Sequence, residues 1–221
     1  PPIVGECGLG ILVLDFSGSM SERAFSSTEF PEYTQTKIEL VSHALAHALP
    51  AMRSISRAEN AYIAIIRFAA RAELIDIIRA SDVESDEDYW KEWVIRKRSE
   101  TLNKFGDGTN ISEALKCAKD LYDSALKGDM KKYGLEDFAP MYHDIAIGDK
   151  ICSVANVRVF LYSDGEHTVG PFVNYFQDAS LIPGRSNVSG LITAYFGPPG
   201  TKGYATLEDI AGVLSLIHIS E

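Results

Sequence analysis

Apolar runs alternate with amphipathic segments along this chain, and each run has the length of a buried strand. A segment that is apolar at successive positions predicts a strand covered on both faces, as in a parallel sheet. Segments in which apolar residues recur at helical spacing predict helices that cover such a sheet. The alternation predicts an α/β domain with a doubly wound, mostly parallel sheet and helices on both faces. The expected strands lie at about 9–15, 61–68, 72–78, 157–162 and 189–196, and the expected helices at about 36–53 and 110–126, followed by a last helix after residue 200.

The strand at 72–78 is expected to be an antiparallel edge of this sheet. Only residues 69–71 separate it from the strand at 61–68. A parallel crossover needs about a dozen residues or more, so the two strands must run in opposite directions.

Local signals indicate where the helices begin and end. Pro50 should kink or shorten the first helix near its end. Asn110 and Glu113 fit an N-terminal cap pair for the second helix, and Thr206 and Asp209 fit one for the last helix.

Two stretches interrupt the alternation. Residues 79–105 are acidic, then aromatic, then basic, which predicts a short helix inside an insertion. Trp90 and Trp93 within it form either a surface for a partner or, as we favour, a small satellite core beneath the insertion. The polar stretch from Lys127 to about Ser153 predicts a second insertion.

Composition narrows the class of protein and of partner. The 221 residues suffice for one well-buried domain, and 46% of them are hydrophobic. The formal net charge of -10 makes nucleic acid and anionic membranes poor partners. No apolar run has the roughly 18 residues of a membrane span, and no signal-peptide pattern is visible. The three cysteines lack metal-site spacing, so we expect reduced thiols and a cytoplasmic protein.

The ends of the chain carry an expectation of their own. Residue 1 is Pro, and the octet 214–221 is what the read-through of a transposase adaptor used in sequencing libraries would encode. We therefore expect one domain over residues 1–213, cut short at its C-terminus, and an artefactual tail over 214–221. The alternative is a genuine final strand that matches by chance.

Oxygen-bearing side chains follow the first strand directly. Asp15 ends the apolar run, Ser17 and Ser19 come next at two-residue spacing, and Gly18 allows a sharp turn. In open α/β folds, ligands bind at this carboxyl edge of the sheet. One carboxylate and two hydroxyl oxygens are hard ligands, which suit Mg²⁺ or Mn²⁺ better than zinc or copper.

The pattern Asp15-Phe16-Ser17-Gly18-Ser19 resembles the opening of the metal site in von Willebrand factor A (VWA) domains. Two later residues match the rest of that family's site: Thr109, in the turn Gly106-Asp107-Gly108-Thr109, and Asp164, after the strand at 157–162. The resemblance covers about residues 9–213. It implies the Rossmann-like VWA fold and a metal-ion-dependent adhesion site.

That resemblance also implies how the site would work. One Mg²⁺ or Mn²⁺ would be held directly by Ser17, Ser19 and Thr109, and through water by Asp15 and Asp164. The cation would capture an acidic side chain of a protein partner at an open position. Bacterial intracellular members of the family are adaptors in larger assemblies, whereas extracellular members bind surface ligands. The absence of disulfide spacing favours the intracellular type.

Other interpretations compete with this one. The hydroxyls and Asp164 could simply cap turns and helices. A hydrolase or phosphatase using Asp15 as nucleophile is the alternative from another class, but Ser17 stands where such phosphatases need a second Asp as general acid. His167, Asp107 and Glu166 could add further polar groups to the site, but solvated loop residues are favoured for Asp107 and Glu166, and no role in the site is favoured for His167. For His43 and His47, spaced four apart on a helix, a solvated face is favoured over a metal site.

Overall fold

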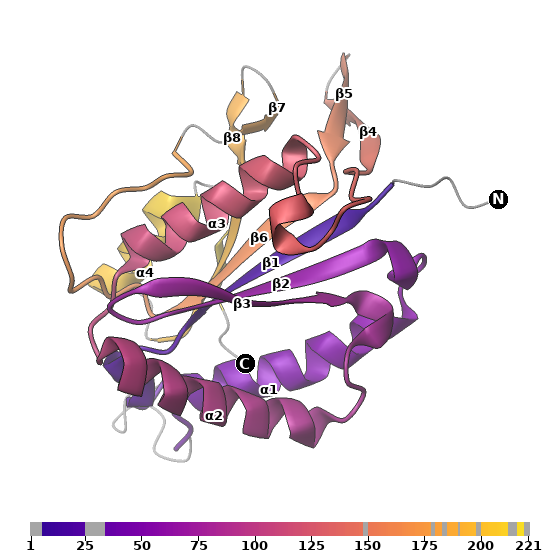
Figure 1. Ribbon diagram of the computed structural model, residues 1–221. Helices are drawn as coiled ribbons and strands as arrows, with labels where there is room; N and C mark the ends of the chain where they lie inside the picture. Colours follow the sequence, from indigo (N-terminus) through magenta and orange to yellow (C-terminus); the bar gives the residue numbers. More distant parts are fainter. Residues whose placement is uncertain are drawn as a thin grey trace.

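The centre of the fold is a six-stranded sheet of order β10-β9-β6-β1-β2-β3. Figure 1 shows β6, β1, β2 and β3 side by side in this sheet. All neighbouring strands are parallel except β3, which pairs antiparallel with β2 at the edge of the sheet. The computed structural model describes residues 6–24, 34–147, 150–177, 180–182, 185–189, 191–197, 200–211 and 216–218. The strands of the sheet are β1 (Gly8–Asp15), β2 (Ala61–Phe68), β3 (Ala72–Arg79), β6 (Val157–Ser163), β9 (Leu191–Tyr195) and β10 (Leu216–His218).

Helices cover both faces of this sheet. Helices α1 (Lys37–Ala51) and α2 (Glu87–Phe105) lie on one face, and α3 (Ile111–Leu126) and α4 (Lys202–Ala211) lie on the other (Figure 1). The predicted fold class, a doubly wound and mostly parallel sheet with one antiparallel edge strand, is therefore confirmed.

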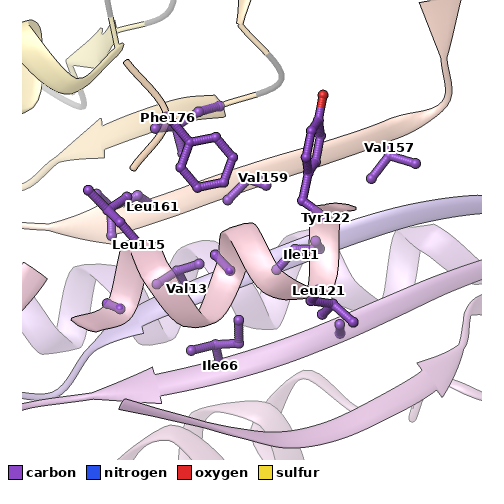
Figure 2. Packing of buried hydrophobic residues seen from close by; sticks show 14 of the residues in the cluster. Ile11, Val13, Ile66, Leu115, Leu121, Tyr122, Val157, Val159, Leu161 and Phe176 are labelled. Atoms are coloured by element: carbon purple, nitrogen blue, oxygen red, sulfur yellow. The ribbon is translucent and has the colours of Figure 1, made fainter. Parts of the chain in front are cut away.

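Strand β1 shows why the sheet needs both layers. Ile11 and Val13 pack into the core beneath α3, whereas Leu12 and Leu14 pack on the opposite face against α1. Figure 2 shows the α3 side of this core, where Leu115 lies over the strands. Because successive side chains point to opposite faces, an apolar run without alternation is buried only between two layers.

The prediction for residues 79–105 was wrong in two respects. The helix α2 is 19 residues long and forms half of one covering layer, so it is neither short nor confined to an insertion. Trp90 and Trp93 are buried in the same cluster as Leu45 of α1, so they belong to a main core rather than to a satellite one. The charged residues around the two tryptophans masked the apolar stripe of this helix.

The helix ends also differ in part from the prediction. Helix α1 ends at Ala51, one residue after Pro50, and a 3-10 turn follows. The side chain of Asn110 accepts a hydrogen bond from the Glu113 amide, so that cap is confirmed. The capping role of Thr206 was wrong, since Thr206 lies inside α4 and its hydroxyl donates to the Lys202 carbonyl.

Smaller elements complete the fold. The predicted second insertion contains the antiparallel pair β4–β5, and a second short pair is β7–β8. No helix among the described residues is both long and apolar enough to cross a membrane. The two short strand pairs consist of β4 (Tyr142–Ile147) with β5 (Lys150–Ala155), and β7 (Ser180–Ile182) with β8 (Arg185–Ser189). Short 3-10 turns lie at Gly18–Ser21, Met52–Ser54, Ala58–Asn60, Ala80–Asp82 and Lys131–Tyr133.

Part of the expected tail lies in the sheet. Strand β10 pairs with β9 in the register Leu216↔Thr193. The expected domain end at Val213 lies outside the described residues. The adaptor origin of 214–221 stays a prediction.

Candidate metal centre

Asp15 ends β1 and is completely buried at the carboxyl edge of the sheet. Its Oδ1 accepts a hydrogen bond from the Ser17 amide over 2.9 Å, and its Oδ2 accepts one from the Ser163 hydroxyl over 2.5 Å. The chain then turns into a 3-10 helix at Gly18–Ser21, which brings the Ser17 and Ser19 hydroxyl oxygens to 3.3 Å from each other. Three of the five predicted ligands thus lie on one compact loop.

A backbone hydrogen bond joins this loop to the segment that carries Thr109. The Gly18 amide donates to the Asp107 carbonyl over 2.8 Å. Thr109 follows two residues later, is buried, and immediately precedes the Asn110 cap of α3. Asp107 therefore contributes its carbonyl to the architecture of the site.

Thr109 is joined in turn to the segment after β6. Its amide donates to the Thr168 hydroxyl over 2.9 Å, and its carbonyl accepts from the Thr168 amide over 2.9 Å. The sequence pattern gave no reason to single out Thr168. The contact of Thr168 with Thr109 forms only because the segment after β6 folds back over the start of α3.

Asp164 comes directly after β6 and is almost completely buried. Its Oδ1 accepts a hydrogen bond from the Glu166 amide over 3.2 Å. Its Oδ2 accepts one from the Lys37 ammonium group over 2.8 Å. The structure thus brings all three predicted segments together at one edge of the sheet.

The electrostatics of the two aspartates fit a cation. Burial, and after it the nearby negative charge of Asp164, raises the pKa of Asp15 to about 7, against the opposing hydrogen bonds from Ser163 and Ser17. A buried carboxylate whose ionised form is disfavoured by burial and by a neighbouring negative charge is stabilised when a positive charge joins it. Within the described part of the chain, no three His, Cys, Asp or Glu side chains cluster as metal ligands, so a cation here would depend on hydroxyl oxygens.

Two basic side chains border the site, and neither was predicted from the sequence. Burial alone lowers the pKa of Lys37, but its hydrogen bonds and ion pairs with Asp164 and Glu22 outweigh that effect and raise it. Arg98 of α2 donates through Nη2 to the Ser17 carbonyl over 3.3 Å and also contacts Ser21. Its Nε is buried and has no hydrogen-bond partner among the described residues. One signal for Lys37 was available, because it lies four residues before Val41 on the buried face of α1.

The remaining polar candidates play other parts. His167 accepts a hydrogen bond from the Ile111 amide at its Nδ1 over 3.2 Å, so it caps the start of α3. Burial, followed by the charge of Asp164, raises the pKa of Glu166. His43 and His47 are both exposed on α1, in agreement with a solvated face.

A cavity of about 720 Å³ opens beside Asp164. Lys37, Glu166 and Phe172 line it, together with Lys202 and Thr201 near the start of α4. This cavity borders the Asp164 side of the site.

Comparison with known proteins identifies likenesses of fold only. No protein-family model matches the chain, and no curated protein sequence matches it. Proximal thread matrix protein 1 from the mussel byssus, solved with a zinc-occupied MIDAS motif, is 13% identical over 97% of this chain, with a TM-score of 0.49. This chain spans 44% of that protein's chain.

Two bacterial structures are similar to a comparable degree. An aerotolerance-related membrane protein from Bacteroides fragilis is 15% identical, covers 96% of this chain and 92% of its own, and has a TM-score of 0.48. A von Willebrand factor type A structure from Catenulispora acidiphila is 14% identical, covers 98% of this chain and 39% of its own, and has a TM-score of 0.46. Solved structures similar to this chain thus include VWA domain structures.

Proposed function

We propose that this chain is a protein interaction module that depends on a divalent cation and binds an acidic side chain of its partner. The observation that carries the proposal is the meeting of two buried carboxylates, Asp15 and Asp164, with the hydroxyls of a loop that backbone hydrogen bonds tie together. Buried negative charge and closely spaced hydroxyl oxygens at one place are the donors that a hard divalent cation prefers.

The residues that would hold Mg²⁺ or Mn²⁺ are those predicted from the sequence. Ser17, Ser19 and Thr109 would supply neutral oxygen ligands, while Asp15 and Asp164 would supply charge. A bound Mg²⁺ keeps exchangeable positions, so it would supply a Lewis acid for an incoming carboxylate. The task of this chain's own residues would then be to hold these oxygens in place around the cation.

The geometry favours binding over hydrolysis. A nucleophilic aspartate must reach its substrate, but Asp15 has no exposed surface and both of its oxygens accept hydrogen bonds. Ser17 occupies the place of the general acid, and a hydroxyl of ordinary acidity protonates a leaving group poorly. We therefore propose a non-enzymatic role. Turnover of a phosphate or acyl ester with Mg²⁺ that disappears in Asp15→Ala would overturn it.

The chemistry of the partner follows from the cation. We propose a protein partner that offers an Asp or Glu side chain, in the manner of an adaptor within a larger cytoplasmic assembly. The net charge of -10 disfavours nucleic acid and anionic membranes as partners.

An open cation position can be tested without knowing the partner. Mn²⁺ bound by the protein should enhance the relaxation of water protons, because exchangeable water remains on the ion. N-acetylglutamate amide, as a soluble carboxylate, should reduce that enhancement by displacing water, whereas N-acetylglutamine amide should not. Equal effects of the two compounds would contradict carboxylate capture. A pull-down with the full-length gene product, with and without EDTA, would then identify the partner.

A further inference from the structure

Lys37 places a buried ammonium group against the metal site. Its Nζ lies 2.8 Å from Asp164 Oδ2 and 3.1 Å from Glu22 Oε2. The side chains of Lys37 and Asp164 are 7% and 2% exposed, whereas that of Glu22 is 66% exposed. The pair with Asp164 is therefore the one that is shielded from water, where the attraction between two charges is strong.

The position of Lys37 is costly for the helix that carries it. Lys37 is the first residue of α1, directly after the Thr36 cap. A cation at a helix N-terminus faces the positive end of the helix dipole, and burial removes its hydration. The carboxylates of Asp164 and Glu22 compensate for these costs. The buried position of Lys37 therefore depends on its contact with Asp164.

Two positively charged side chains already border the site without a metal ion. Lys37 contacts Asp164 and the exposed Glu22, and Arg98 is anchored on the Ser17 carbonyl. A divalent cation that enters this site must share Asp164 with an ammonium group already in contact with it. Like charges repel, so each fixed cation weakens the binding of the next.

We propose that Lys37 is an internal cation that holds Asp164 in the metal-free protein and competes with the divalent cation for that carboxylate. Lys37 thereby sets the cation affinity of the site. This inference rests on the proposed function, because it takes Asp164 as part of a cation site.

Removal of the ammonium group tests the competition. Lys37→Met keeps the length and apolar stem of the side chain but leaves Asp164 without its buried positive partner. In calorimetric titration with MnCl₂, Lys37→Met should bind about tenfold tighter than the wild type, or more. Addition of MgCl₂ should also raise the melting temperature of Lys37→Met by more than that of the wild type, since the ion restores a partner to Asp164.

Two further variants isolate the effect of the charge. Lys37→Gln keeps a hydrogen-bond donor but no charge, so it should also bind Mn²⁺ more tightly, and it serves if Lys37→Met does not fold. Lys119→Met is the charge-matched control, because Lys119 pairs with Asp123 over 2.6 Å on α3, at a more exposed position. It changes the net charge equally and should leave the Mn²⁺ affinity unchanged.

The outcomes separate this inference from the proposed function. Wild-type binding with unchanged or weaker binding in both Lys37 variants overturns the inference and leaves the proposed function standing. If the Lys37 variants bind Mn²⁺ and the wild type does not, the inference is supported, but the proposal that the wild-type protein depends on a cation is contradicted. Folded proteins that bind no Mn²⁺ in any form overturn both.

Discussion

The Gly18 amide donates a 2.8 Å hydrogen bond to the Asp107 carbonyl, and this contact couples the two hydroxyl-bearing segments of the site. Gly18 lies between Ser17 and Ser19, and Asp107 lies two residues before Thr109. A Cβ atom at Gly18 would lie 3.2 Å from the Asp107 Cβ and 3.3 Å from its carbonyl oxygen. The two segments therefore approach so closely that a side chain at Gly18 must push them apart.

Gly18→Ala should weaken Mn²⁺ binding by roughly tenfold, because the Thr109 segment moves away from Ser17 and Ser19. Calorimetric titration checks the affinity, and thermal melting checks the fold. Gly10→Ala is the control in the same strand region, since its Cβ would meet only Phe160, at 3.9 Å. Equal affinities of the two variants would show that the close approach does not matter for the site.

Asp15 predicts a pH dependence of stability for the metal-free protein. Its pKa is about 7 when folded, against an ordinary value of 3.8. Between these values the folded protein keeps a proton that the unfolded chain has lost, so the free energy of unfolding contributed by Asp15 falls as pH rises from about 4 to about 7.

Asp15→Asn removes this titration. In EDTA, the difference in unfolding free energy between wild type and Asp15→Asn should shift in favour of the variant as pH rises through that window. Urea unfolding at several pH values measures it. Parallel stability curves for the two proteins would contradict the raised pKa.

Gly165 should tolerate no side chain. A Cβ at Gly165 would overlap the backbone carbonyl of Gly203, at the start of α4. Gly165→Ala should therefore destabilise the fold by several kcal/mol, of which roughly 1–2 kcal/mol comes from the left-handed backbone alone. Gly170→Ala separates the two effects, because Gly170 has the same φ of +73° and a Cβ there meets no described atom within 4 Å. Urea unfolding should show the larger loss for Gly165→Ala, and equal losses would exclude the overlap.

Thr109 should act through its hydroxyl. Thr109→Ala removes that oxygen from a buried position and should weaken Mn²⁺ binding by about tenfold or more. Thr109→Ser keeps the hydroxyl and should bind nearly as well as the wild type. If calorimetry shows the same affinity for both variants, Thr109 is a structural residue of the α3 turn.

The sheet could be predicted from the sequence because its strands are buried on both faces. Strand β2 coincides with its predicted range, and β1 differs from its prediction by one residue. Helix α2 was underestimated, because charged residues surround Trp90 and Trp93 and hide its apolar stripe. The cap of α4 was misplaced, because Thr206 carries a cap-like spacing inside a helix that begins at Lys202.

The residues of the site also divide into those that the sequence predicts and those that it does not. Asp15, Ser17, Ser19, Thr109 and Asp164 stand out in the sequence, since each follows a strand or precedes a helix. Their basic neighbours do not, because the pairing of Lys37 with Asp164 joins residues 127 positions apart. Such contacts depend on how α1 and α2 dock on the sheet, and no local pattern encodes that.

Calorimetric titration of the wild type and Asp15→Ala with MnCl₂ tests the central claim most directly. The wild type should bind one Mn²⁺ per chain, and Asp15→Ala should bind none while keeping its fold by circular dichroism. Indistinguishable titrations of two folded proteins would contradict a cation site at Asp15.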